Sequence, residues 1–197
     1  MILDDLLTDH KAQLGKVAAR FTADDDADFI RHLHNAATRL STKRLRWIAT
    51  TLTLSSGVAD YPAPADLLGA PATDWGTHPS RQPWDGDFVG YAPRLLEVDV
   101  GGTAMIRVVP TPTASQIAVW GATARVHYLA RHRIDDAGVT FAEGDRPLVL
   151  LAALVEAMRE LAADTTVVQL QKGLSGLPTA GTPAYLYEKL RDELERA

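Results

Sequence analysis

The sequence predicts an α+β fold: a small helical bundle with an inserted antiparallel β module and an extended C-terminal arm that ends in a helix. Apolar residues recur at helical spacing near both ends of the chain, and β-branched residues alternate in its middle. Alternating βαβ units, which would indicate a doubly wound sheet, are not found. We expect the bundle at residues 1–45 and 140–165, the β module at 46–133, and the arm with its helix at 166–197.

The composition is that of a folded protein with a mild excess of acidic groups. Hydrophobic residues make up 46% of the 197 residues, and 25 acidic against 20 basic residues give a formal net charge of −5. This balance argues against binding nucleic acid by charge alone. The chain has no cysteine, which excludes disulfides and thiolate metal sites. It has neither a membrane-length apolar run nor a secretory leader pattern, so we expect a soluble protein that acts where it is made.

Two amphipathic helices are predicted at the start of the chain. In residues 1–20 one apolar face is formed by Leu3, Leu6, Leu7, Leu14, Val17 and Ala18. Gly15 weakens this helix by about 1 kcal/mol relative to alanine. A second helix is predicted to begin at Thr22, with Asp25 as a weak capping-box partner. Its buried stripe is expected to be Phe29, Leu33, Ala36, Ala37 and Leu40.

The polar residues of the second helix do not match a metal site. Asp24, Asp25 and Asp26 are adjacent, whereas a calcium loop places its ligands at alternate positions, so we interpret them as a solvated helix start. His32 and His34 are two residues apart and point to different helix faces, so they cannot share one ion. We expect both histidines at the surface or facing a partner.

The β module is predicted to begin with a strand at residues 46–54, where β-branched residues alternate with others. The Ser-Ser-Gly segment that follows suggests a hairpin with the next short strand at residues 58–61. Two prolines then favour an extended path over residues 61–68, with Asp66 as a candidate cap of a short turn.

A long irregular segment, residues 69–93, is rich in glycine and proline and also holds Trp75, Trp84, Phe88 and Tyr91. It exceeds the roughly 12 to 15 residues expected of a loop in a compact domain. Because disordered segments are poor in aromatic residues, we expect this loop to order against its own sheet or against a neighbouring chain. The two alternatives stay open at this point.

A hairpin is predicted at residues 95–109, where Gly101 and Gly102 form the turn and later prolines stop the pairing. Residues 117–133 are expected to be a long extended run. Its candidates for burial are Val119, Ala122, Ala124, Val126 and Tyr128. The module would then hold five or six strands.

Histidines near the end of this run could be imagined as a metal or acid–base site. The residues concerned are His127, His132, Asp135 and Asp136. Their spacing matches no metal template, so we assign them no catalytic role, no metal and no cofactor.

The most strongly patterned helix is predicted at residues 146–163, with Asp145 as N-cap and Pro147 in the first turn. Its apolar stripe consists of Leu150, Leu154, Ala157, Met158 and Leu161. The stripe is wider in the N-terminal half of the helix, where it also includes Val149, Leu151 and Val155. We therefore expect this half to be buried on more than one side. Residues 167–170 could be a short strand or an extension of this helix. A last helix from Thr182 carries a narrow stripe of Leu186, Leu190 and Leu194, which suits a partner's surface or the edge of its own bundle.

The order of these elements and several short motifs resemble a known family. Two N-terminal helices precede Y-x-x-P-x-D (Tyr61, Pro64, Asp66), a strand ending in P-x-P (Pro110, Pro112), an extended V-x-Y (Val126, Tyr128) and an Ala/Leu-rich helix. This pattern is similar to the head-to-tail adaptor proteins, also called connector or head-completion proteins, of tailed bacteriophages and gene transfer agents. The resemblance covers residues 1–165 and the C-terminal amphipathic piece.

The resemblance implies a structural virion protein, made in the host cytoplasm, and not an enzyme. Family members form a homo-oligomeric ring, usually a dodecamer, between the portal and the next neck or tail protein, and DNA passes through the lumen without sequence-specific binding. The implied partners are therefore the portal, another neck or tail protein and further copies of the chain, with no membrane. The candidate partner interface consists of Trp75, Trp84, Phe88, Tyr91, Tyr185, Leu186, Leu190 and Leu194.

Two other functions are considered. A different neck or tail component, such as a tail terminator, would have a sheet with one or two helices, whereas helices flank the predicted sheet on both sides here. A small enzyme would need converging titratable groups, for which the candidates are His127, His132 and Asp135.

Overall fold

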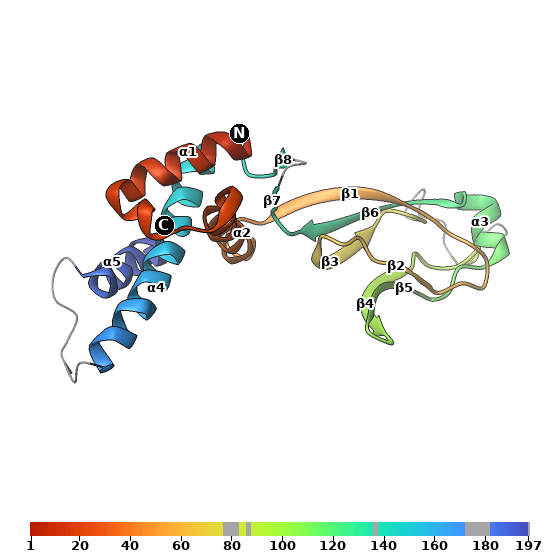
Figure 1. Cartoon of the computed structure of the whole chain (residues 1–197). Helices are drawn as coiled ribbons and strands as arrows, with labels where there is room; N and C mark the ends of the chain where they lie inside the picture. The colour runs from red at the N-terminus through yellow and green to blue at the C-terminus, as the bar shows by residue number, and fades with distance from the viewer. Residues whose placement is uncertain (77–82, 86–87, 136–137, 172–181, 197) are drawn as a thin grey trace. The chain divides into compact units, whose positions relative to one another are not determined.

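The computed structural model describes residues 1–76, 83–85, 88–135, 138–171 and 182–196 (Figure 1). Its helices and antiparallel sheets confirm the α+β class. The chain divides into two compact units. We call Met1–Arg44 with His132–Ala197 the helical unit, and Leu45–Arg131 the β unit.

The helical unit is organised around one long helix, α4. Its elements are α1 (Leu3–Leu14), 3₁₀ segments at Gly15–Arg20 and Asp24–Asp26, α2 (Ala27–Leu40), a short ladder of β7 (Ile134–Asp135) with β8 (Gly138–Val139), a 3₁₀ turn at Glu143–Asp145, α4 (Arg146–Gln171) and α5 (Pro183–Arg196). Helix α4 packs against α1, α2 and α5. Within the described part of the chain, no helix is long and apolar enough to cross a membrane.

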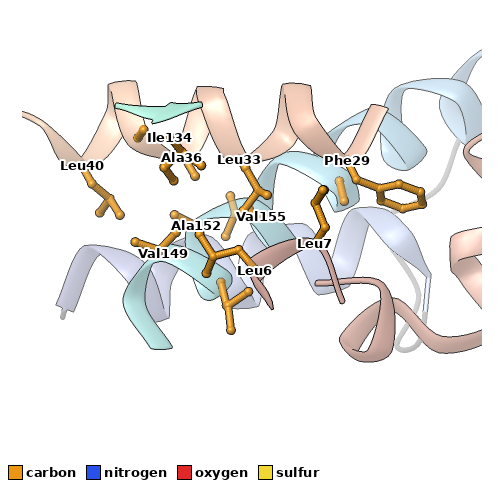
Figure 2. Close-up of a cluster of buried hydrophobic side chains, with 14 of the residues drawn as sticks. Leu6, Leu7, Phe29, Leu33, Ala36, Leu40, Ile134, Val149, Ala152 and Val155 are labelled. Carbon is orange, nitrogen blue, oxygen red and sulfur yellow. The ribbon is translucent and has the colours of Figure 1, made fainter. Parts of the chain in front are cut away.

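The core of the helical unit lies where α1 and α2 meet α4 (Figure 2). Leu6 of α1, Leu33 of α2 and Val155 of α4 are buried completely or almost completely. Along α4 the buried positions include Val149, Leu150, Ala152, Ala153, Val155, Ala157 and Met158. They occupy more than one face, as the sequence predicted, and each fully buried large aliphatic side chain contributes roughly 1.5–3 kcal/mol.

The predicted first helix of residues 1–20 is wrong beyond Leu14. Gly15 takes φ 54° and ψ −127°, so the α-helix ends there and Gly15–Arg20 continues as a 3₁₀ segment. A glycine adopts this conformation readily, whereas any other residue would be strained. The break separates α1 from the segment that carries Phe21 back to the core.

The second helix begins at Ala27 and not at Thr22, so the predicted capping box is absent from the described structure. Asp25 and Asp26 both have positive φ, 53° and 60°, which prevents a continuous helix from Thr22. Aspartate tolerates the left-handed region better than most residues. The carboxylate of Asp28 accepts a hydrogen bond from the Ala23 amide at 3.2 Å instead.

Helix α4 continues to Gln171, so residues 167–170 extend it and do not form a strand. The part of the predicted arm between residues 172 and 181 lies outside the described residues. Helix α5 then packs along α4 in the same unit.

The β unit consists of two three-stranded antiparallel sheets and one short helix. One sheet has the order β1 (Arg46–Thr53), β6 (Thr123–Ala130), β3 (Leu67–Thr73), and the other the order β2 (Asp60–Pro62), β5 (Thr103–Val109), β4 (Arg94–Val100). Helix α3 (Ala114–Trp120) precedes β6. Buried side chains from both sheets form its core: Leu54, Tyr61, Leu67, Trp75, Ile106, Val108, Ala124, Val126, Tyr128 and Ala130.

The two predicted hairpins have different outcomes. The β4–β5 hairpin is confirmed, with Gly101 and Gly102 at positive φ in the turn and the Asp99 carboxylate accepting from the Gly102 amide at 2.8 Å. The hairpin around Ser55 is wrong, because β1 pairs with β6 and β2 pairs with β5. Strand β6 is as long as β1, so it offers β1 eight paired residues, whereas β2 has only three.

The predicted extended run of residues 117–133 begins as a helix. The Thr113 side chain accepts from the Gln116 amide and the Gln116 side chain accepts from the Thr113 amide, which is a complete capping box. Gly121, at φ 84°, ends α3 before β6 starts. Val119 and Ala122 are consequently exposed, whereas the predicted burial of Ala124, Val126 and Tyr128 is confirmed.

Candidate partner interface

The outer face of the sheet β1–β6–β3 carries an exposed tryptophan, Trp47. Residues on β1 alternate between exposed and half-buried positions along its eight residues. Directly opposite pairs share a face, so Trp47 lies beside Leu129, Ala49 beside His127, and Thr51 beside Arg125. We call these six residues the outer sheet face. Trp47 is 59% exposed there, which is unusual for a side chain that gains so much from burial.

Strand β1 also forms the outer edge of this sheet. Among the described strands it pairs with β6 alone, so one row of its backbone donors and acceptors faces away from the sheet. The strand is regular over eight residues, contains no proline, and carries no charge after Arg46. Natural proteins usually protect such an edge, because an open edge pairs readily with another chain.

The other sheet edges are protected. Strand β3 contains Pro71 and two register shifts in its pairing with β6. Strand β2 has only three residues and ends at Pro62, and β4 carries charged residues at Arg94, Glu97 and Asp99. The contrast singles out β1 as the edge best suited to accept a strand from another molecule.

Trp75 does not belong to the candidate interface, which corrects the prediction. It is 4% exposed, and its ring packs edge to face on Trp120 with the centroids 5.0 Å apart. The indole Nε1 donates to the Gly121 carbonyl at 2.8 Å. A Cβ at Gly76 would lie 2.6 Å from the Trp120 ring, so this close packing requires a glycine. Trp75 therefore holds the start of the long loop on its own unit.

Trp84 and Tyr91, from the same loop, are 80% and 71% exposed, as a partner contact would require. Phe88 is half-buried and packs edge to face against Tyr91 with the ring centroids 5.3 Å apart. The intervening residues 77–82 and 86–87 lie outside the described residues.

The predicted stripe on α5 is divided between the core and the surface. Leu194 is 1% exposed in the core of the helical unit, and its carbonyl accepts from the Lys43 ammonium at 2.7 Å. The prediction that Leu194 faces a partner is therefore wrong. Leu190 is partly buried against the same core, whereas Tyr185 and Leu186, in the first turn, are exposed. Helix α5 thus lies on its own bundle, and only its N-terminal end is available to a partner.

The motif residues that carry the family resemblance have structural roles within the β unit. The Tyr61 hydroxyl accepts from the Ser55 amide at 2.9 Å, which fixes the loop after β1. The Tyr128 hydroxyl donates to Asp66 Oδ1 at 2.8 Å and so ties the start of β3 to β6. Burial and the neighbouring carboxylate raise the pKa of Tyr128 to about 12, so this phenol stays protonated.

The histidines considered for catalysis belong to different units. His127 belongs to the β unit, and His132 belongs to the helical unit, where its ring stacks on Phe141 with the centroids 4.0 Å apart. His132 and Asp135 line a shallow hollow together with His34, while Asp136 lies outside the described residues. Within the described residues, no group of three His, Asp or Glu side chains could hold a metal ion.

Two features escaped the sequence analysis. The alternation of residues 46–54 predicts a strand, but it does not predict which side of that strand faces outward, and the outward side carries Trp47. His32 was expected at the surface, yet it is 1% exposed and contacts an equally buried His10. His10 lies one turn after Leu6 and Leu7 on the apolar face of α1, which was the signal that could have identified it.

Comparison with known proteins adds no further identification. The chain matches no protein-family model, and no curated protein matches it in sequence.

Proposed function

We propose that the chain is a structural virion protein: a head-to-tail adaptor of a tailed bacteriophage or gene transfer agent that forms a ring between the portal and the next neck or tail protein. The order of elements supports this proposal, since helices flank an inserted β unit as they do in the family that the sequence resembles. The motif residues Tyr61, Asp66 and Tyr128 all serve the architecture of the β unit.

The observation that carries the proposal is the combination of Trp47 on the outer sheet face with the unprotected edge of β1. Aromatic side chains are enriched at the centres of protein interfaces, and an open strand edge supplies backbone hydrogen bonds to a second chain. Both features make contacts between copies of the chain favourable. Trp84 and Tyr91 provide a second aromatic contact, which we assign to a neighbouring subunit or neck protein.

A binding role has more support than a catalytic one. The titratable groups that an enzyme would need to bring together, His127 and His132, belong to different units. A net charge of −5 is compatible with a ring whose lumen lets DNA pass without retaining it.

The test is assembly of the full chain with the portal protein encoded in the same genome. We expect a ring of about twelve copies on the portal, seen by negative-stain microscopy and by mass photometry, even where the isolated chain is monomeric. A chain that stays monomeric both alone and with the portal would overturn the proposal.

The same experiment separates the tail-terminator alternative. A terminator would form its ring on the tail tube and would leave the portal unbound. An adaptor would bind the portal first and would then recruit the next neck or tail protein.

A further inference from the structure

Two buried histidines connect the helices of the helical unit. His10 on α1 is 0% exposed and His32 on α2 is 1% exposed. His10 Nε2 lies 3.3 Å from His32 Nδ1, and the two rings meet edge to face. His32 Nε2 in turn lies 3.1 Å from Glu160 Oε2 on α4. One line of hydrogen bonds therefore joins α1, α2 and α4.

The Glu160 carboxylate, at one end of this line of hydrogen bonds, determines which nitrogen of each imidazole carries the proton. An ionised Glu160 only accepts, so His32 donates from Nε2 and is left with an unprotonated Nδ1. His10 must then donate from Nε2 to that nitrogen. His10 Nδ1 is left as an acceptor that is buried without a hydrogen-bond partner among the described residues. Both imidazoles are neutral in this arrangement.

Aromatic rings exclude water from the pair. Phe21 packs edge to face on His32 with the centroids 4.9 Å apart, and Phe29 packs on His10 at 6.0 Å. Lys11 of α1 lies over the Phe29 ring and pairs with Asp26. The aromatic surroundings of His10 are therefore apolar, and the nearby ammonium of Lys11 is neutralised by Asp26.

The charged groups around the pair are already paired with one another. Arg31 of α2 donates to both oxygens of Glu160, at 2.9 and 2.7 Å, and also pairs with Asp28 at 2.9 Å. On α4, one turn before Glu160, Glu156 pairs with Arg39 and Arg159. Glu160 contacts the side of His32 that faces away from His10. A proton on His10 would thus lack a direct anionic partner in the described structure.

We propose that His10 and His32 form a proton-sensitive latch, which holds α1 against α2 and α4 while both rings are neutral and releases α1 when His10 takes up a proton. Protonation gives His10 a donor at Nδ1 in a site that offers no acceptor. Releasing α1 exposes the ring to water and removes this penalty.

The direction of the pH dependence follows from the same environment. Burial and the neighbouring His32 lower the pKa of His10 to about 4, and burial lowers the pKa of His32. Both rings have a pKa near 6.5 in the open chain, so the released state binds more protons between about pH 6.5 and pH 4. The latch is therefore intact above about pH 6.5 and loses stability progressively as the pH falls toward 4.

The two units can be observed separately in the full chain. All four tryptophans belong to the β unit, whereas every described helix except α3 belongs to the helical unit. Between pH 7 and pH 4 we expect faster amide exchange in residues 3–14 and a loss of helical circular dichroism, with tryptophan emission unchanged. Helical signal and exchange that stay constant down to pH 4 would overturn the proposal.

Matched variants test whether the acid-induced loss of helical signal arises from His10 and His32. The double variant His10→Leu with His32→Leu replaces both polar partners by apolar groups, which buried sites often accept at little cost. We expect its transition to move down by about one pH unit or more. His34→Leu, an exposed position two residues further along α2, is the control and should keep the transition of the unmodified chain. An unmoved transition in the double variant would contradict the latch.

A measurement on the unmodified chain covers the case in which the double variant does not fold. The imidazole carbon-bound protons report each titration by nuclear magnetic resonance. We expect the His10 signal to stay that of a neutral ring to below pH 5 and to change together with the helical signal. A His10 that titrates near 6.5 with the helices intact would overturn the latch.

Discussion

Trp75 and Trp84 illustrate how two tryptophans from one loop can have opposite roles. The ring of Trp75 packs in the core of the β unit and donates a hydrogen bond to Gly121, whereas the ring of Trp84 is 80% exposed. Sequence position does not distinguish them, because both lie among glycines and prolines. Their packing predicts very different responses to truncation.

We expect Trp75→Ala to destabilise the β unit by about 3–5 kcal/mol, since it removes a buried ring and leaves a cavity. Trp84→Ala should change stability by less than about 0.5 kcal/mol, as is usual for exposed positions. Denaturant unfolding followed by the emission of the remaining tryptophans measures both effects. Similar losses in the two variants would show that this description of the loop is wrong.

At the same scale, the histidine pair shows why a residue type predicts little without its environment. His32 and His34 are two residues apart on one helix, yet only His32 is buried. The second polar partner, His10, comes from a helix 22 residues away in the sequence. The pairing therefore depends on how α1 packs on α2, which no local pattern encodes.

Among the elements, α1 owes its length to one glycine. Gly15 adopts φ 54°, and a Cβ built there would meet no atom within 4 Å, so substitution strains the backbone without causing a clash. We expect Gly15→Ala to destabilise the helical unit by about 1 kcal/mol or more. Gly144→Ala is the control, because that glycine also has open space and does not have a positive φ. Thermal unfolding followed by helical circular dichroism should show a lower midpoint for Gly15→Ala alone.

The edge strand β1 allows a test of assembly at the scale of one element. Thr51→Lys adds a charge to the outer sheet face, on an edge strand that carries no charge after Arg46. Charged side chains on an edge strand are a device by which natural sheets prevent pairing. We expect this variant to fold normally but to lose most of its ability to form a ring on the portal. Thr111→Lys adds the same charge at an exposed loop position of the same unit and should assemble as the unmodified chain does. Mass photometry of both variants with the portal provides the comparison, and normal assembly of Thr51→Lys would exclude β1 from the subunit contact.

For the whole molecule, the main feature is that each unit has a hydrophobic core of its own. The helical unit gathers side chains from α1, α2, α4 and α5, and the β unit gathers them from its two sheets and Trp75. A unit with its own core is expected to fold by itself. We expect residues 45–131, expressed alone, to show the blue-shifted emission of a buried Trp75 and a cooperative unfolding transition. The emission of an unfolded chain would show that the β unit depends on the helical unit.

The sequence by itself determined the α+β class, the helix at 146–163, the β4–β5 hairpin and the burial of Val126 and Tyr128. These features follow from local spacing and turn chemistry, which act over a few residues and are visible in the chain. Other features could not be obtained in this way. The tertiary structure decided that β1 pairs with β6, that Leu194 is buried while Trp47 is exposed, and that His10 meets His32. Each of these depends on contacts between residues distant in sequence, whose free energy exists only once the elements have packed.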